Sequence, residues 1–109
     1  MTDEARPRFD DGKLVTAVVQ DATSGDVLMV AHMNEEAWNA TLTTGRATFY
    51  SRSRRMLWEK GETSGNVMLV REAWVDCDAD SVLLKVDAAG PACHTGAPSC
   101  FFTPVALSS

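Results

Sequence analysis

Apolar runs separated by short polar segments dominate the chain, and several of these runs are rich in β-branched residues. Such runs, bounded by turn-forming residues, are typical of β-strands. The segment 21–26 (DATSGD) indicates a turn between the first two runs. Strands are therefore predicted at 14–20, 27–33, 48–51, 67–75 and 81–86.

One segment carries the signals of a helix instead. Asn34 is suited to cap its start, and the two glutamates that follow would lie in the positively polarised first turn. Trp38 and Leu42 are four residues apart and would share a face, and Gly45 would end the helix.

The remaining segments are polar or irregular. Residues 1–12 show no periodicity and predict a flexible N-terminal arm, with the domain at 13–109. The segment 61–66 (GETSGN) is loop-like, and glycines and prolines after Ala88 indicate an ordered irregular loop. The core is expected to be closed by Phe101, Phe102 and Val105. We predict an α+β fold, a β-dominated single domain with one main helix.

Length and composition fit one globular domain, with 109 residues of which 45% are hydrophobic. No apolar run approaches the ~18 residues of a membrane span. The N-terminus lacks the basic start and the apolar stretch of a signal peptide. We therefore expect a cytoplasmic protein without a membrane partner.

The net charge of −5 disfavours nucleic acid as a partner, because sequence-independent binding needs an electropositive surface. The ten basic residues are nevertheless unevenly spread, and half of them lie in one short segment with only Glu59 against them. They are Arg46, Arg52, Arg54, Arg55 and Lys60. This cluster is either a solvated edge or an anion site suited to a phosphorylated small molecule.

Three cysteines give the clearest chemical signal. Cys77, Cys93 and Cys100 are odd in number and follow no export signal, which argues against a disulfide framework. Thiolates suit zinc, and three protein ligands would leave a fourth position for water, as in catalytic sites. The alternative is three unrelated core cysteines, but Cys93 and Cys100 sit among Gly, Pro, His and Ser rather than on apolar strands.

An acidic run overlaps the first cysteine. If this segment is extended, Asp76, Asp78 and Asp80 share one face and Cys77 lies on the other. Three neighbouring carboxylates repel one another unless a cation neutralises them, and oxygen ligands suit magnesium. An EF-hand is not favoured, because its sixth position would be Ser81 rather than glycine. An acidic surface turn without a metal stays an alternative.

Chain length predicts that the zinc site is shared between two subunits. The strand that follows Cys77 carries the chain roughly 20 Å away. Only the segment 88–92 remains to bring Cys93 back, and fully extended it barely covers that distance. A homodimer in which one chain supplies Cys77 and the other supplies Cys93 and Cys100 removes the difficulty.

His94 directly follows Cys93. Beside a three-thiolate site we expect His94 to be catalytic, as an acid or a base, because a fourth ligand would close the position that water needs. A satisfied loop histidine is the alternative. His32, between an apolar strand and the helix, is expected to be structural.

Three segments together resemble a known family. They are 51–66 (SRSRRMLWEKGETSGN), 76–80 (DCDAD) and 90–101 (GPACHTGAPSCF). In this order and with these cysteine spacings, they strongly resemble phosphoribosyl-AMP cyclohydrolase of histidine biosynthesis, and the likeness runs from about residue 14 to residue 102.

The resemblance implies that water opens the adenine ring of 1-(5-phosphoribosyl)-AMP at the N1–C6 bond. The product would be the formimino-AICAR ribonucleotide, in the third step of L-histidine biosynthesis. The resemblance also implies one zinc per subunit on the three cysteines, magnesium on the three aspartates, and a homodimer with sites across its interface. Larger relatives carry a fused pyrophosphohydrolase domain, so this chain is expected to catalyse only the cyclohydrolase step.

The side chains of the segment that precedes the acidic run suit the substrate. Magnesium would hold one phosphate, while Arg52, Arg54 and Lys60 would bind the other. Trp58 would stack on the purine or serve as a packing element, and Ser64 would lie in a phosphate-binding loop.

Three rival functions differ in their sequence requirements. A structural zinc module would need His94 or His32 as a fourth ligand. A redox sensor would need a paired reactive thiol, which the Cys93–Cys100 spacing does not offer. A zinc deaminase would need a His-x-Glu and Pro-Cys-x-x-Cys signature that the chain lacks.

Overall fold

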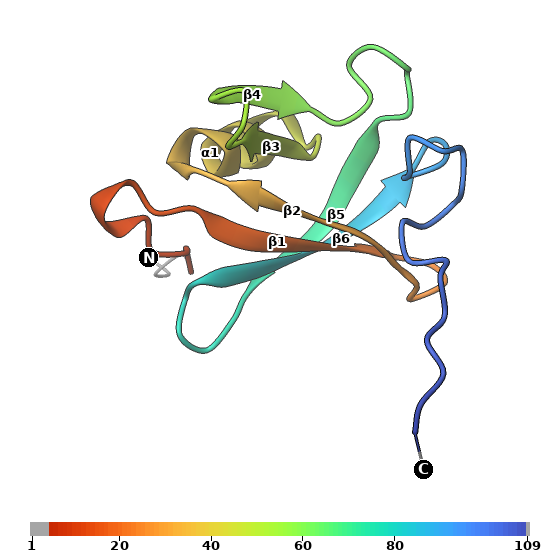
Figure 1. Cartoon of the computed structure of the whole chain (residues 1–109). Coiled ribbons are helices and arrows are strands. Elements are labelled where there is room, and N and C mark those ends of the chain that lie inside the picture. Colours follow the sequence, from red (N-terminus) through yellow and green to blue (C-terminus); the bar gives the residue numbers. More distant parts are fainter. Residues whose placement is uncertain (1–4, 109) are drawn as a thin grey trace.

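The computed structural model describes residues 5–108, and its main element is a curved four-stranded sheet (Figure 1). The sheet strands are β1 (Val15–Asp21), β2 (Val27–Met33), β5 (Met68–Val75) and β6 (Ser81–Ala88). The helix and the second sheet are α1 (Glu35–Thr44), β3 (Thr48–Ser51) and β4 (Met56–Glu59). Within the described residues, the predicted α+β fold with mostly strands and one α-helix is confirmed.

The strand order of the main sheet is β2-β1-β6-β5. β1 pairs antiparallel with β2, and parallel with β6 after a long crossover through the helix, the hairpin and β5. β5 and β6 pair antiparallel. Because β1 and β6 run in the same direction, both strands begin at one end of the sheet and finish at the other.

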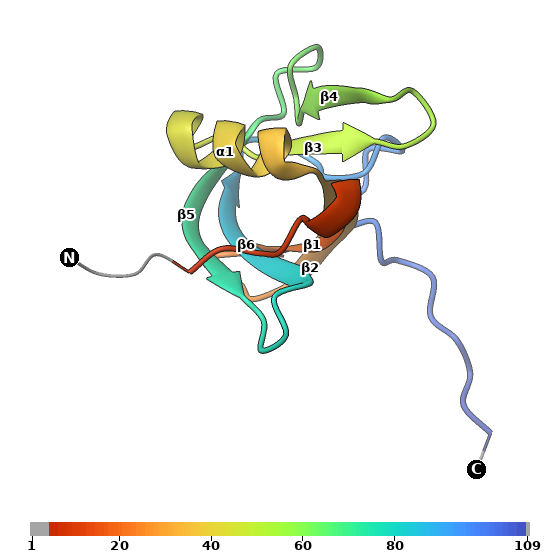
Figure 2. The same cartoon turned by 90° about the vertical axis from the view of Figure 1, so that its left-hand side faces the viewer.

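The core lies between the sheet and the layer formed by α1 and β3 (Figure 2). Alternate residues of the two central strands are buried on this face: Val15, Ala17, Val19, Val82, Leu84 and Val86. This period of two follows from the pleat, since successive side chains of a strand point to opposite faces. Trp38 from the helix and Phe49 from β3 fill the space above them.

The opposite face of the sheet carries a row of apolar residues, one from each strand. The strand registers place Val30 beside Val18, Val18 beside Leu83, and Leu83 beside Trp74. Val30 and Trp74 keep 45% and 56% of their surface exposed. Figure 2 shows α1 and the hairpin on the other side, so no helix or strand of residues 5–108 covers this row. Contiguous exposed apolar surface of this kind commonly marks an interaction site.

The helix begins and ends where the sequence predicted. The Asn34 side chain accepts a hydrogen bond from the Ala37 N–H (2.8 Å), and Gly45 ends α1 with a φ of 76°. Glycine adopts this left-handed conformation without the steric cost of a side chain. Trp38 is buried but Leu42 is exposed, so only the first of the pair joins the core.

Two expectations for the second half of the chain are wrong. Residues 56–59 form β4, which pairs with β3, whereas the sequence predicted only a basic cluster there. Phe101, Phe102 and Val105 do not close the core, because all three are exposed and the segment extends away from the sheet (Figure 1). The core is instead completed by residues of α1 and β3, including Trp38 and Phe49.

The predicted flexible arm spans residues 1–12, of which 1–4 lie outside the described residues. In the remainder, Pro7 is buried and the Arg8 N–H donates to the Ala79 carbonyl (2.8 Å). The segment Asp10–Gly12 then forms one 3-10 turn. Across residues 5–108, no helix has both the length and the apolar character needed to cross a membrane.

Candidate active site

The irregular loop after β6 contains Cys93 and Cys100. The Cys93 N–H donates to the Ala97 carbonyl (3.2 Å), which closes a turn within the loop. The Cys100 N–H donates to the Leu28 carbonyl (2.7 Å), which attaches the loop to the beginning of β2. The loop therefore lies at the end of the sheet where β1 and β6 finish.

The Cys93 and Cys100 thiols are close enough to change each other's pKa. Hydrogen bonds with Thr95, whose Oγ1 lies 3.1 Å from Cys93 Sγ, are the main cause of the lowered pKa of Cys93. Desolvation is the main cause of the raised pKa of Cys100, and the Cys93 thiol adds to it. The loop folds back at Gly96, whose φ is 92°, and brings the two thiols nearer than their spacing along the chain indicates.

Asp76, Asp78 and Asp80 lie together in the turn between β5 and β6. One oxygen from each carboxylate lies within 4.8 Å of the others. The segment is not extended as predicted, because Ala79 adopts a φ of 61° and Asp76 Oδ1 accepts hydrogen bonds from the N–H groups of Asp80 (3.0 Å) and Ser81 (3.1 Å). A tight turn, rather than the alternation of a strand, brings the three carboxylates together.

The three carboxylates of this acidic turn hydrogen-bond and repel one another. Desolvation acts to raise the pKa of Asp76, but hydrogen bonds from the Ser81 N–H and from the two neighbouring aspartates outweigh it and lower the pKa. The pKa of Asp78 is raised by hydrogen bonds with Asp80 and Asp76 and by repulsion from both. A divalent cation relieves such repulsion, and oxygen donors suit magnesium.

Cys77 lies in the acidic turn, at the opposite end of β6 from the cysteine loop. β6 has 8 residues and is therefore roughly 26 Å long at ~3.3 Å per residue. Its first residue, Ser81, pairs with Thr16 near the start of β1. Among the described residues, Asp76, Asp78 and Asp80 are the one group of three that is close enough to hold a metal ion within a single chain. Cys77 does not join the other two cysteines.

Three of the five residues of the basic cluster lie in the turn between β3 and β4. The Arg54 N–H donates to Ser51 Oγ (3.3 Å), and Arg55 adopts a φ of 53° to complete the turn. Arg52, Arg54 and Arg55 are all exposed. Their guanidinium groups are therefore available to an anion.

Two adjoining hollows open beside this turn. The first has a volume of about 370 Å³ and is lined by Arg52, Trp58 and His32, among others. The second has a volume of about 300 Å³ and is lined by Arg54 and Trp58, together with two serines. Trp58 packs against Phe49, and their ring centroids are 5.0 Å apart. Trp58 thus lines both hollows, one together with Arg52 and the other together with Arg54.

Lys60 and Ser64 lie farther along the chain, toward the cysteine loop. Lys60 Nζ donates to the Ala92 carbonyl (2.7 Å). Ser64 is exposed, and its Oγ accepts a hydrogen bond from the Asn66 N–H (3.2 Å). Asn66 packs so closely on Gly90 that a Cβ at that glycine would lie 2.3 Å from Asn66 Oδ1. The loop after β4 is therefore packed against the segment that leads to Cys93.

The two histidines differ in their surroundings. His94 is exposed in the cysteine loop, directly after Cys93. His32 is half-buried on β2 and lines the hollow with Arg52 and Trp58. Sequence reasoning treated His32 as structural and did not consider Thr95, the hydrogen-bond partner of Cys93. The alternation of β2 places His32 on the face opposite the core, and this signal was available in the sequence.

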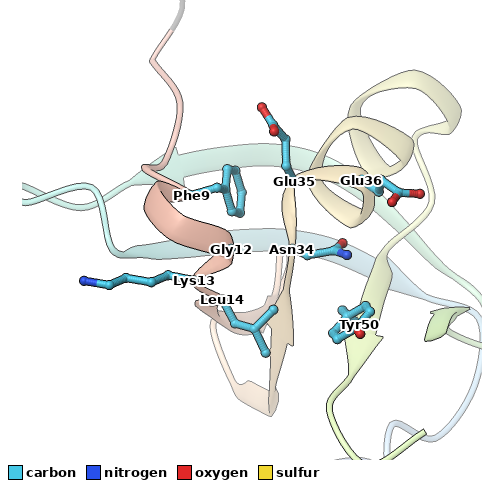
Figure 3. Close-up of a pocket in the computed structure, with 8 residues that line it drawn as sticks. All are labelled: Phe9, Gly12, Lys13, Leu14, Asn34, Glu35, Glu36 and Tyr50. Atoms are coloured by element: carbon cyan, nitrogen blue, oxygen red, sulfur yellow. The ribbon is translucent and has the colours of Figure 1, made fainter. Parts of the chain in front are cut away.

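Another cavity of about 370 Å³ lies at the start of α1 (Figure 3). Phe9 and Leu14 of the N-terminal segment and Tyr50 of β3 contribute to its walls. The polar groups at the start of α1 already have partners within the chain. Asn34 caps the backbone, and Glu35 accepts a hydrogen bond from Arg6 (2.6 Å). The lining includes none of the predicted site residues.

Comparison with known proteins shows which family contains these motifs. The sequence model of the phosphoribosyl-AMP cyclohydrolase family matches residues 29–102. The chain belongs to this family. Curated phosphoribosyl-AMP cyclohydrolases include one from Rhizorhabdus wittichii that is 64% identical over 96 residues, which cover 88% of this chain and 77% of the relative. Relatives from Sphingopyxis alaskensis and Brucella abortus are 59% and 58% identical over 104 residues each, covering 95% and 94% of this chain and 82% and 87% of those proteins.

The region that matches the phosphoribosyl-AMP cyclohydrolase family begins in β2 and ends just after Cys100. It therefore contains the basic hairpin, the acidic turn and the cysteine loop. The apolar residues Val105 and Leu107 lie beyond it.

Proposed function

We propose that the protein is a phosphoribosyl-AMP cyclohydrolase. It would use water to open the adenine ring of 1-(5-phosphoribosyl)-AMP at the N1–C6 bond and form the formimino-AICAR ribonucleotide, in the third step of L-histidine biosynthesis. The observation that carries this proposal is the position of the family motifs, since the hairpin with Arg52 and Trp58 is joined through Lys60 to the loop with Cys93 and Cys100.

We propose zinc as the metal of the cysteines and magnesium as the metal of the acidic turn. The donor sets fit these ions, because the thiols of Cys93 and Cys100 lie close together and the three aspartate oxygens lie within 4.8 Å. Cys77 would complete the zinc ligands from a second subunit. When bound, zinc supplies the Lewis-acid activation of water that hydrolysis near neutral pH requires.

Two features support a homodimer with its zinc site shared between subunits. The length of β6 separates Cys77 from Cys93 within one chain. The row of Val18, Val30 and Leu83 with Trp74 offers an apolar surface that a second copy would bury. A dimer axis that pairs the acidic turn of one subunit with the cysteine loop of the other would create two equivalent sites.

Different side chains of this family member would bind the phosphate, stack on the purine and transfer the proton. The guanidinium groups of Arg52 and Arg54 suit the oxygens of one phosphate, and Trp58, which lines both hollows, suits the purine ring. In the reaction, the water oxygen becomes the carboxamide oxygen and N1 takes up a proton as its bond to C6 breaks. We assign that proton movement to His94, which is exposed beside Cys93.

Replacing His94 with alanine is expected to slow turnover by about 10²- to 10⁴-fold, the usual contribution of a general acid or base. Zinc content should stay near that of the unmodified protein, because His94 is not one of the proposed ligands. Stopped-flow turnover and elemental analysis of the same preparation test both statements. A large loss of zinc would instead identify His94 as a fourth ligand and favour a closed structural site.

The proposed activity itself is tested by an ultraviolet assay. Purified protein loaded with zinc and magnesium should change the absorbance of phosphoribosyl-AMP as the purine ring opens, and should leave AMP and adenosine intact. Mass spectrometry should find a product that is one water heavier than the substrate. If the metal-loaded protein shows no turnover, and chelation unfolds it, a structural zinc module explains the cysteines better.

The cytoplasmic location of the protein stays a prediction.

A further inference from the structure

The backbone at Lys60 and at the residue that follows it is fixed by close contacts. It directly follows β4, and its N–H donates to the Ala47 carbonyl (3.0 Å). Gly61 follows with a φ of 83°, and a Cβ there would lie 2.3 Å from the backbone carbon of Asn66. Only glycine fits such a close approach, so the direction of the chain at Lys60 is set by the loop behind it.

The Lys60 side chain leaves the hairpin and reaches the cysteine loop. Its Nζ donates to the Ala92 carbonyl at 2.7 Å, and Ala92 keeps only 2% of its surface exposed. Ala92 immediately precedes Cys93, and its N–H donates to the Pro98 carbonyl (3.2 Å). Both polar backbone groups of Ala92 are therefore used, one by Lys60 and one by the far side of the loop.

The ammonium of Lys60 has no acidic partner among residues 5–108 that would draw it away from the cysteine loop. No carboxylate of the described chain forms an ion pair with Lys60, whereas its neighbour Glu59 pairs with Arg46 (3.5 Å). The Lys60 ammonium instead contacts the Ala92 carbonyl, directly before Cys93.

We propose that Lys60 is a positioning residue for the cysteine loop, which fixes the Ala92 carbonyl directly before Cys93, rather than a ligand of a substrate phosphate. This inference rests on the proposed function only in that the thiolates bind zinc. Lys60 thereby connects the hairpin to the metal ligands, because its backbone directly follows β4 and its side chain binds the residue before Cys93.

The inference is tested by the zinc affinity of Lys60→Met, measured without substrate by competition with a chromophoric chelator. The dissociation constant should rise about 10- to 100-fold, as it does when a residue that supports a metal ligand is removed. Lys60→Arg keeps a cation and its donors, and should recover much of the affinity. Should Lys60→Met fail to fold, Lys60→Gln takes its place with the same expected direction.

Arg52→Met is the matched comparison, since it removes a cation of the same hairpin that faces the substrate hollow. It should raise KM and leave zinc affinity unchanged, whereas Lys60→Met saturated with zinc should keep its KM. Wild-type zinc affinity in Lys60→Met, or a raised KM at full zinc occupancy, would overturn the inference. Because zinc affinity is measured without substrate, a weakened site in a protein that never turns over phosphoribosyl-AMP would support the role of Lys60 and refute the proposed function.

Discussion

Replacing Cys93 with alanine is expected to remove bound zinc and turnover together. Cys93 is one of two thiols that lie close together in the loop, and hydrogen bonds with Thr95 lower its pKa, which favours the thiolate form that binds metal. A site left with two protein ligands cannot hold zinc at full occupancy. Turnover should fall by more than about 100-fold, beyond the loss caused by removing a residue that only supports a ligand.

The measurement combines elemental analysis with the ultraviolet assay on one preparation. Ala97→Ser is a suitable control, because it changes a side chain in the same loop but retains all three thiols and the backbone carbonyl that accepts from the Cys93 N–H. Thermal unfolding of the metal-free variant shows whether the fold survives. Undiminished turnover by a zinc-free Cys93→Ala protein would break the proposed mechanism.

The fold was largely predictable because it depends on local signals and on burial. The strands of the main sheet follow apolar runs, and α1 has both its cap at Asn34 and its stop at Gly45. β4 was missed because its four residues, Met56–Glu59, are only partly apolar and become a strand by pairing with β3. The C-terminal apolar residues were misassigned because hydrophobicity does not say which of two segments, α1 or the tail, covers the sheet.

The site was predictable in its residues but not in its spatial arrangement. Periodicity could not show that a left-handed Ala79 would turn the acidic run and bring the aspartates together. Spacing along the chain could not show that Cys93 and Cys100 approach each other, since a loop of glycine and proline has no fixed direction. The bond from Lys60 to Ala92 joins residues 32 positions apart and leaves no local signal. In contrast, the separation of Cys77 from Cys93 followed from strand length alone.

That separation leads to a test of the shared zinc site. If Cys77 of one subunit meets Cys93 and Cys100 of the other, a mixed dimer of Cys77→Ala and Cys93→Ala subunits contains one site in which every ligand is present. If each site lies within one chain, the mixed dimer contains none. The two arrangements therefore predict one complete site and no complete site in the mixed dimer. The roughly 26 Å length of β6 favours the arrangement shared between subunits.

Each variant alone is expected to be inactive, and mixing equal amounts under conditions that allow subunit exchange should restore about a quarter of wild-type turnover, because half of the dimers are mixed and each has one intact site of two. Zinc content should recover by the same fraction. A mixture of Cys93→Ala with Cys100→Ala should stay inactive, since both changes damage the same loop and no pairing of those subunits assembles all three thiols. Recovery there, or none in the first mixture despite proven exchange, would place the zinc ligands otherwise than between subunits.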